Sequence, residues 1–503
     1  MACHNGMTST AGDDLSIGVA WRATMMANSS RDPYWQASVR RETIDHPKAA
    51  AAIEDECSTC HMPMSHSVSR ASGHEAQVFA HLPVTAGADP LSRLAHDGVS
   101  CTLCHQITPA NLGTPASFTG GFTIDTRTPP EQRPLFGPFA PDPALQKVMH
   151  SATGFQQTEG AHIRQSALCA TCHTLYTTAR DRSGASLGRF PEQVPFQEWQ
   201  HSSYAASTSC QACHMPAIAG AAPVSSVLAQ PREGARRHSF IGGNFFVLGM
   251  LNRFRDALGV EALSPELTRA SAATLAHLEQ SAARLTIDRT AIDASRLTID
   301  VSVSNLSGHK LPTAYPSRRA WIRLIVRDAT GRTVFSSGAL QPSGAIEGNA
   351  NDEQASAFEP HYREIRRGDE VQIYESILAD AAGAVTTSLI SALRYAKDNR
   401  LLPKGFDKAT AHADIAVHGD AREDADFTGD GDRVRYVVDT AGASAPFTVE
   451  ATLLFQPIGF RWADNLRAYQ AAEPMRFVKY FDAMSGESAA TVARAVGLAR
   501  PPR

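Results

Sequence analysis

Alternating apolar and polar positions predict β-strands in the C-terminal half of the chain. The segment RLTIDVSVSN (296–305) places Leu, Ile or Val at every second position and Thr, Asp or Ser between them. AWIRLIVRDATGRTVFSSG (320–338) predicts a strand, an Asp-Ala-Thr-Gly turn and a second strand, and PFTVEATLLFQP (446–457) predicts another strand. We therefore expect an antiparallel β-sandwich domain over residues 291–460.

Helical periodicity flanks this predicted domain. SPELTRASAATLAHLEQSAARL (264–285) begins with Ser264 as the expected N-cap and Pro265 at the first helical position, and its leucines recur near helical spacing as far as Leu285. This pattern predicts a helical linker over 236–290. The end of the chain, starting at RWADNLRAYQ, predicts a C-terminal helical segment over 461–503.

The first 235 residues differ from the rest of the chain in composition and in periodicity. They contain all nine cysteines, most of the histidines and many Pro and Gly, but few long periodic runs, with one short helix predicted at DPYWQASVRRE (32–42). Such a region needs something other than aliphatic side chains to fill its core. The predicted fold class is α+β, with a mostly helical and coil N-terminal domain over 1–235 and a C-terminal antiparallel sheet domain.

Eight of the cysteines fall into four pentapeptides of the form C-x-x-C-H. This is the attachment signature of c-type haem, because two thiols add to the two vinyl groups of one porphyrin and the adjacent His ligates the iron. The expected thioether residues are Cys57, Cys60, Cys101, Cys104, Cys169, Cys172, Cys210 and Cys213. The expected proximal iron ligands are His61, His105, His173 and His214.

Zinc ribbons and thioredoxin-like redox pairs also use C-x-x-C. Neither explains a His after every second Cys, and zinc knuckles place their cysteine pairs closer together than these unevenly spaced motifs. The sequence therefore predicts four complete sites for haem c.

The chain starts MACHNG, in which Cys3 and His4 form the second half of such a motif. We expect a native product that begins upstream of Met1, with a signal peptide and a Cys three residues ahead of Cys3. Cys3 would then bind, and His4 would ligate, a fifth haem whose site is truncated here. The alternative is an incidental N-terminal cysteine.

Composition narrows the function classes. The formal charge is −4, with 47 basic and 51 acidic residues and no basic run, which gives no argument for nucleic-acid binding. No apolar run approaches the length of a membrane span. Covalent haem attachment to C-x-x-C-H takes place outside the cytoplasmic membrane in bacteria, so we expect a periplasmic or extracellular protein.

Several segments around the motifs resemble a known family. WRATMMANSSRDPYWQA (21–37), ECSTCHMPM (56–64), DGVSCTLCHQI (97–107), SALCATCHTLY (166–176) and the region around EWQHSSY are similar to multihaem cytochromes c related to the tetrahaem partner of hydroxylamine oxidoreductase. NLSGHKLPTAYPSRRAWIRL (305–324) resembles a GHKxPTxYPSRRAW segment that follows the haem domain in large bacterial multihaem cytochromes. The resemblance implies electron transfer and a haem-plus-β architecture.

The resemblance also implies histidine as the distal ligand of most haems. His150, His162 and His201 lie where the family places distal ligands shortly before a haem motif, with a surface or hydrogen-bonded His as the alternative. His66 and His238 are weaker candidates. In WRATMMANSS, relatives commonly have His where this chain has Met26, so Met26 either ligates iron or packs in the core.

Two further features remain. The loop SGHKLPT presents His309 on a turn stiffened by Pro312, and we predict that His309 is a distal ligand to a haem of the N-terminal domain; a His that bonds the carbonyls of its own loop is the alternative. EDADFTGDGD (423–432) is able to hold Ca²⁺ but does not match the EF-hand pattern, so we expect a solvated acidic turn.

The function best supported by these patterns is a relay of single electrons between other redox proteins. A multihaem oxidoreductase that acts on a small nitrogen or sulfur compound at an open haem is the first alternative. A haem-bearing assembly component, with the β-domain as a docking module, is the second. The sequence contains no C-x-x-C-K variant and no nucleophile motif.

Overall fold

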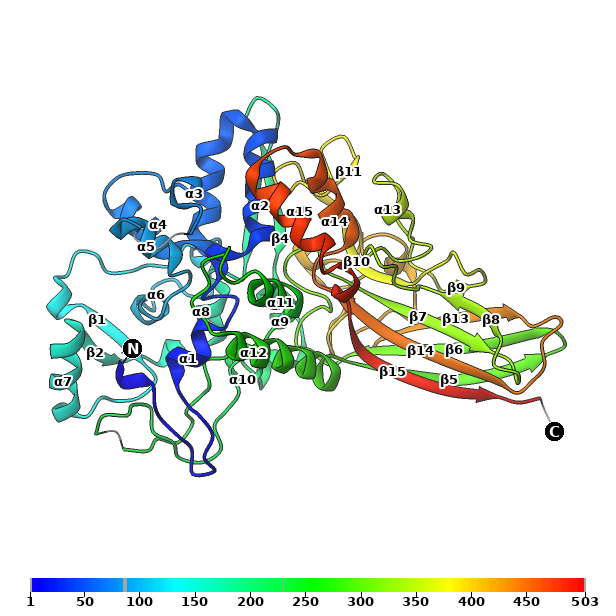
Figure 1. Ribbon diagram of the computed structural model, residues 1–503, viewed down its shortest axis with the longest axis horizontal. Coiled ribbons are helices and arrows are strands. Elements are labelled where there is room, and N and C mark those ends of the chain that lie inside the picture. Colours follow the sequence, from blue (N-terminus) through cyan, green and yellow to red (C-terminus); the bar gives the residue numbers. More distant parts are fainter. Residues whose placement is uncertain (1, 85–87, 229, 502–503) are drawn as a thin grey trace. The chain divides into compact units, whose positions relative to one another are not determined.

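A computed structural model describes the chain except for residues 1, 85–87, 229 and 502–503 (Figure 1). The chain divides into two compact units. The first comprises 1–175, 208–274 and 471–477, and the second comprises 176–207, 275–470 and 478–503. Residues 176–207, which separate two haem motifs, therefore belong to the second unit. In the described part of the chain, no helix is both long and apolar enough to cross a membrane.

The first unit consists of short helices, long loops and one small parallel strand pair. Its helices are α1 (Ile17–Arg22), α2 (Pro33–Asp45), α3 (Ala50–His61), α4 (Pro63–Ala71), α5 (Pro90–His96), α6 (Cys101–Gln106), α7 (Pro143–Thr153), α8 (Ser166–Ala170), α10 (Cys210–His214) and α11 (Phe245–Arg253). Strands β1 (Pro134–Gly137) and β2 (Gln156–Glu159) form the pair. Helix α12 (Ser264–His277) begins in this unit and ends in the second.

Helix α2 forms where the sequence predicts it. The carboxylate of Asp32 accepts hydrogen bonds from the backbone N–H groups of Tyr34 (2.9 Å) and Trp35 (3.3 Å), and Pro33 occupies the first helical position. An N-cap that satisfies two of the free N–H groups fixes the start of the helix. The helix thereby places Trp35 against the first complete haem motif, as described below.

The second unit contains two larger sheets and a β-hairpin. The hairpin consists of β3 (Leu175–Arg180) and β4 (Ser186–Gln193). The four-stranded sheet has the order β5-β6-β13-β9, from β5 (Ala283–Asp293), β6 (Arg296–Asn305), β13 (Asp432–Asp439) and β9 (Glu364–Ile365). Neighbouring strands in this sheet are antiparallel, except that β13 and β9 are parallel to each other.

The seven-stranded sheet is antiparallel, with β7 and β14 at its centre. Its main order is β11-β10-β7-β14-β15, while β12 also pairs with β10 and β8 with β7. The strands are β7 (Arg319–Arg327), β8 (Thr333–Ser337), β10 (Ile373–Ala379), β11 (Val385–Thr386), β12 (Arg394–Asp398), β14 (Phe447–Gln456) and β15 (Ala490–Ala499). Trp321 packs with Ile346, Val371 and Ile373 in a fully buried cluster. Helices α9 (Pro195–Gln200), α13 (Ala350–Glu353) and α14 (Phe460–Asp464) complete the larger elements, and α15 (Ala472–Asp482) begins in the first unit and ends in the second.

The predicted α+β fold class is confirmed, as are the strands predicted at 296–305, 320–338 and 446–457. Two details differ from the expectations. The helix from Ser264 gives way to a π-turn over Leu278–Ala282, and Leu285 lies in strand β5 rather than in a helix. The C-terminal helices are followed by β15, which pairs with β14 and was not predicted.

Candidate haem-binding site

Each complete haem motif lies in or beside a short helix. Cys57–His61 forms the last turn of α3, Cys101–His105 lies in α6, and Cys210–His214 is the whole of α10. The first cysteine of the fourth motif, Cys169, lies in α8 and is followed by a turn. Residues three and four apart share one face of a helix, so this local structure places two thiols and one imidazole on the same side.

The histidines of four motifs are held in the same way. In each, the Nδ1 atom is hydrogen-bonded to a backbone carbonyl oxygen: His4 to Val224 (2.7 Å), His61 to Ser29 (3.3 Å), His105 to Phe136 (2.5 Å) and His214 to Ile241 (2.5 Å). A carbonyl can only accept, so Nδ1 carries the proton and the lone pair of the neutral ring is on Nε2. This tautomer is the one that an axial iron ligand requires.

Burial supports the neutral state of two of these rings, those of His61 and His105. It lowers the pKa of His61 to about 4, and it also lowers the pKa of His105. The indole ring of Trp35 stacks on the imidazole of His61, with centroids 4.5 Å apart and planes 6° apart. The stacking and the carbonyl contact together fix the orientation of this imidazole.

The thiols of different motifs lie against one another. Cys60 is hydrogen-bonded to Cys172, and Cys169 to Cys210. Burial, with a smaller contribution from the nearby Cys172, raises the pKa of Cys104 to about 12, while the contact with Cys169 lowers the pKa of Cys210 to about 7. All nine cysteines are outside disulfide bonds. The four complete motifs therefore form one contiguous group.

Backbone and spacer contacts fix the motifs relative to each other. The backbone N–H of Cys210 donates to the Ser166 hydroxyl (3.0 Å), and the Gln211 amide donates to the carbonyls of Ile163 (3.2 Å) and Gln165 (2.8 Å). These bonds connect the last motif to the segment that precedes Cys169. The half motif at the N-terminus is also anchored, because the N–H of Ser226 donates to the Cys3 carbonyl (2.8 Å).

The donor set fits haem better than zinc. In the part of the chain that the structure describes, no cysteine belongs to a group of three or more ligand atoms gathered closely enough for one metal ion. A structural zinc site would need four such ligands in a tetrahedron. The paired thiols with an oriented imidazole instead match the residues that attach and ligate one haem each.

Three of the candidate distal ligands lie in the first unit. His150, on α7, is half-buried and its Nδ1 contacts the carbonyl of Phe155 (3.0 Å), as in the motif histidines. His162 is buried, but here Nε2 rather than Nδ1 contacts a carbonyl, that of Ile107 (2.9 Å). The two ring nitrogens of His162 therefore have the opposite roles from those of the motif histidines. Met26 is half-buried, and its carbonyl accepts from the N–H of Val99 (3.0 Å), two residues before Cys101.

The other two candidates lie in the second unit. The Nε2 of His201 contacts the carbonyl of Asp407 (2.9 Å), and its ring packs edge-on against Phe406. The Nδ1 of His309 contacts the carbonyl of Lys310 (2.9 Å), within its own loop. The structure thus divides the five candidates between the two units.

The carbonyl partners of the motif histidines could not be found from the sequence, because every residue carries a carbonyl. A further histidine, His238, lies near these motifs. Burial lowers its pKa to about 4, with a smaller contribution from the nearby His105. Its Nδ1 contacts the carbonyl of Arg236 (3.3 Å).

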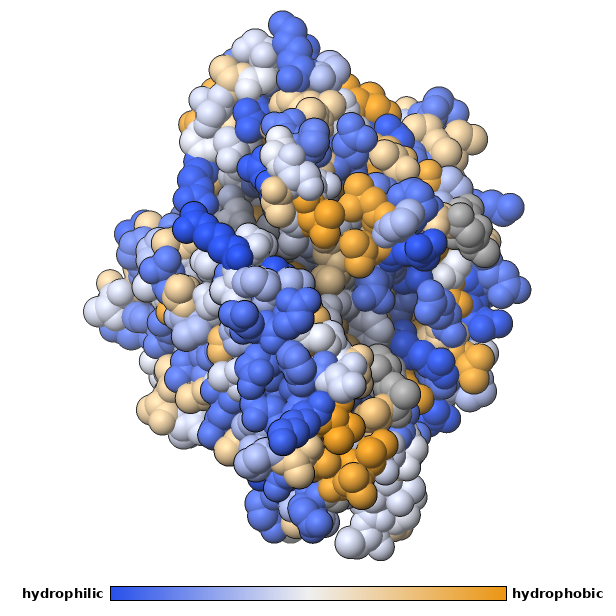
Figure 2. All heavy atoms as spheres, turned by 90° about the vertical axis from the view of Figure 1, so that its left-hand side faces the viewer, coloured by the Kyte–Doolittle hydropathy of each residue, from blue (hydrophilic) through white to orange (hydrophobic). Residues whose placement is uncertain are grey.

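The face of the molecule on the side of α7, β1 and β2 is mostly hydrophilic, with separate apolar patches (Figure 2).

No protein-family model matches the chain, and no curated protein matches it in sequence. Among solved structures, the chain is similar to the "penta-heme cytochrome c552 from Thermochromatium tepidum", with a TM-score of 0.51 and 15% sequence identity over 96% of this chain and 95% of that chain. The chain therefore has the fold of a multihaem cytochrome c.

Proposed function

We propose that the protein is a multihaem c-type cytochrome that relays single electrons between other redox proteins. The observation that carries this proposal is the proximity of the four complete motifs. The thiol of Cys60 contacts that of Cys172 and the thiol of Cys169 contacts that of Cys210, while Cys104 lies near enough to Cys172 for the two thiols to influence each other. Haem c, when bound, supplies a one-electron couple at each motif. The chain contributes the attachment thiols, neutral axial imidazoles of fixed tautomer, and a buried environment that tunes each site.

We include a fifth site in the proposal. A backbone carbonyl, that of Val224, orients His4 in the same way as backbone carbonyls orient His105 and His214. In addition, a solved structure of the same fold is described as penta-heme. Cys3 is the thiol that the given chain offers at this site.

The orientation of the rings ranks the proposed distal ligands. A histidine whose Nδ1 donates to a carbonyl has the Nε2 lone pair that iron needs, which favours His150, His238 and His309. In His162 and His201, a carbonyl contacts Nε2 instead, so Nε2 carries the proton in the neutral ring. These two are the weaker candidates, and Met26 remains the proposed thioether ligand.

We place the protein in the periplasm or outside the cell, where c-type haem is attached in bacteria. The proposal of electron transfer is tested on the haem-loaded protein by mass spectrometry, electron paramagnetic resonance and a redox titration. Loss of one haem per chain in Cys104→Ala, low-spin ferric haems and rapid full reduction and reoxidation by protein partners would support it. A high-spin ferric signal that responds to nitrite, hydroxylamine or sulfite would support the oxidoreductase alternative instead.

A further inference from the structure

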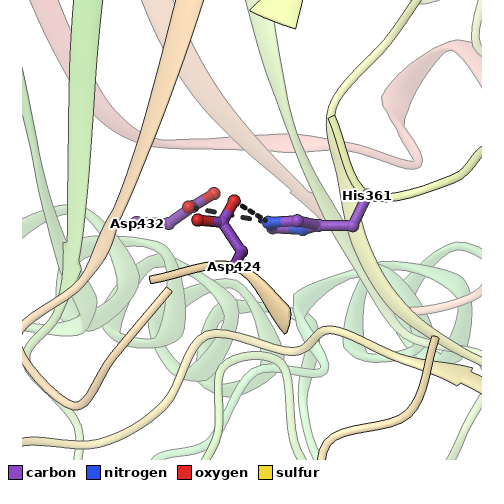
Figure 3. A group of neighbouring side chains, drawn as sticks. All are labelled: His361, Asp424 and Asp432. Carbon is purple, nitrogen blue, oxygen red and sulfur yellow. Dashed lines mark ion pairs between the residues drawn. The ribbon is translucent and has the colours of Figure 1, made fainter. Parts of the chain in front are cut away.

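Three titratable side chains meet in the interior of the second unit, away from every haem motif in the sequence. His361 precedes β9, Asp424 follows a 3-10 turn, and Asp432 is the first residue of β13. Their side chains are 1%, 4% and 0% exposed. Figure 3 shows the imidazole and both carboxylates pointing toward one another. The expectation of a solvated acidic turn is therefore wrong for Asp424 and Asp432, although Asp426 and Asp430 are exposed.

The facing atoms are left without hydrogen bonds. His361 Nε2 lies 3.4 Å from Asp424 Oδ2 and 3.7 Å from Asp432 Oδ1, and none of these three buried atoms has a hydrogen-bond partner. Buried polar atoms of this kind usually mark a bound ion, a water molecule or a proton. The question is which of these the residues can accept.

The hydrogen bonds of the imidazole argue against a metal ion. Gln372 Nε2 (2.9 Å) and Asn399 Nδ2 (3.1 Å) both donate to His361 Nδ1. Neither amide can be reversed, because Gln372 Oε1 accepts from the N–H of Tyr362 (2.8 Å) and Asn399 Oδ1 from the N–H of Glu375 (3.0 Å). Nδ1 is thus an acceptor, and in the neutral ring Nε2 keeps its proton. A protonated nitrogen that points into the site cannot ligate a metal.

The two carboxyl groups, by contrast, can accept a proton on the oxygens that face the imidazole. Asp432 Oδ2 accepts from the Tyr374 hydroxyl (2.7 Å) and from Gln372 Nε2 (3.2 Å), while Asp424 Oδ1 accepts from the N–H of Asp426 (2.9 Å). Their other oxygens lie within 4.8 Å of each other and of His361 Nε2, and Arg363 Nε also lies 3.3 Å from Asp424 Oδ2. Two negative charges this close together in a buried space would repel each other. We propose that Asp424 and Asp432 hold one proton between them, so that the pair carries one negative charge.

The charged groups around the pair locate the proton. Arg363 Nε lies 3.3 Å from Asp424 Oδ2, and the Lys408 ammonium also lies on this side, bonded to the Asp424 carbonyl. These two cationic side chains lie at the Asp424 end of the pair, and the proposal therefore places the proton on Asp432. Tyr374 and Tyr436, the other titratable side chains beside Asp432, have pKa values raised by burial, and Lys397 lies beside His361. Burial, with a contribution from the charge of Asp424, raises the pKa of Asp432 to about 7.

The proposal predicts a specific pH dependence. Native Asp432 keeps its proton up to about pH 7, whereas in the unfolded chain it releases it near the ordinary value of 3.8. Between these values the native state binds more protons, so raising the pH destabilises the protein through this group. His361, whose pKa burial lowers to about 4, acts in the opposite direction over much of this range. A comparison of variants is therefore needed to isolate Asp432.

The experiment uses the full-length, haem-loaded protein. Asp432→Asn mimics the protonated carboxyl, and Asp426→Asn is the matched control in the same turn. From about pH 5 to about pH 8 we expect the melting temperature of the wild type to fall progressively relative to Asp432→Asn, while Asp426→Asn parallels the wild type. A constant difference between wild type and Asp432→Asn would overturn the proposal.

A second measurement decides the matter if Asp432→Asn does not fold. Infrared absorption of the wild type should show a buried protonated carboxyl group that disappears as the pH is raised through about 7. Absence of this band at acidic and neutral pH would overturn the proposal. One equivalent of non-haem divalent metal in the purified protein, lost in His361→Ala, would overturn it as well and assign the site to a metal.

Discussion

His214 and Ile241 are joined by two hydrogen bonds, one from the imidazole of His214 and one to its backbone carbonyl. His214 Nδ1 lies 2.5 Å from the Ile241 carbonyl, and the N–H of Ile241 donates to the His214 carbonyl (2.9 Å). This reciprocal pair ties His214, the proposed axial ligand of the last motif, to a segment 27 residues further along the chain. The orientation of the ring thus depends on the backbone of another segment.

Replacing Ile241 by Pro removes the N–H and one of the two bonds. We expect a loss of about 1–3 kcal/mol in the free energy of unfolding, since the His214 carbonyl loses its donor. We also expect a changed spectrum for one haem, observed by electron paramagnetic resonance. Gly242→Ala is the control, because an added Cβ would have no atom within 4 Å. Equal spectra for both variants would show that the pair does not orient His214.

His150 and His162 differ in which ring nitrogen meets a carbonyl, and this difference can be tested. We expect His150→Ala to convert one haem from low spin to high spin, because its Nε2 carries the lone pair. We expect His162→Ala to leave every haem low spin, since the carbonyl of Ile107 contacts its Nε2. Electron paramagnetic resonance of the two ferric proteins makes the comparison. The reverse result would exclude ring orientation as a guide to ligation.

Met26 is the proposed thioether ligand in the first unit. A thioether favours Fe(II), so we expect Met26→His to lower the midpoint potential of one component in a redox titration while the other components stay in place. Met25→Leu, at the neighbouring position, should move none of them. If no component shifts in Met26→His, Met26 is a packing residue.

Gly98 has a backbone conformation that few other residues could adopt. Its φ is +60°, and a Cβ at this position would lie 2.7 Å from the carbonyl oxygens of both Met26 and Ala27. Gly6 has a similar φ of +71° but no atom within 4 Å of such a Cβ. Gly6→Ala therefore measures the strain of the left-handed backbone alone, about 1–2 kcal/mol.

Gly98→Ala should cost more than Gly6→Ala, because the backbone of Met26 and Ala27 would have to move. Chemical denaturation of the two haem-loaded variants measures the difference in the free energy of unfolding. Equal destabilisation of the two variants would mean that the backbone of Met26 and Ala27 moves aside at no cost in the free energy of unfolding.

Lys310 forms a buried ion pair with Asp398 in the second unit. The Nζ–Oδ2 distance is 2.7 Å, and both side chains are 0% exposed. Lys310→Met would leave a buried carboxylate with one partner fewer, at a cost of about 3–5 kcal/mol. Arg332→Met removes a pair with Asp328 in which the arginine side chain is 59% exposed, at a cost of about 0–1 kcal/mol. Similar midpoints in urea for the two variants would contradict this difference.

The sequence predicted those elements whose local signals agree with their environment. Strand β6 alternates because one face is buried, and α2 carries its own cap at Asp32. Strand β15 was missed because ATVARAVGLA is rich in alanine, a residue with little preference for strands, and it is a strand only through its pairing with β14. Pairing partners far apart in sequence leave no local trace.

The candidate site shows the same limit. Spacing predicts the thioether cysteines and the proximal histidines, because one haem imposes a fixed local pattern. The burial of Asp432 was not predicted, since its partners His361 and Tyr374 are 71 and 58 residues away in the sequence and only the strand register turns its side chain inward. From the sequence alone, an acidic residue next to a Gly-rich turn is expected to be solvated. Only the pairing of the strands shows that the side chain of Asp432 faces the interior.

The contact between His4 and Val224 spans 220 residues and has a consequence for the order of folding. Two segments this far apart in the sequence meet slowly, because the entropy of closing so long a loop is lost before the contact is gained. We therefore expect the ring of His4 to take its final orientation after the local contacts within each complete motif have formed.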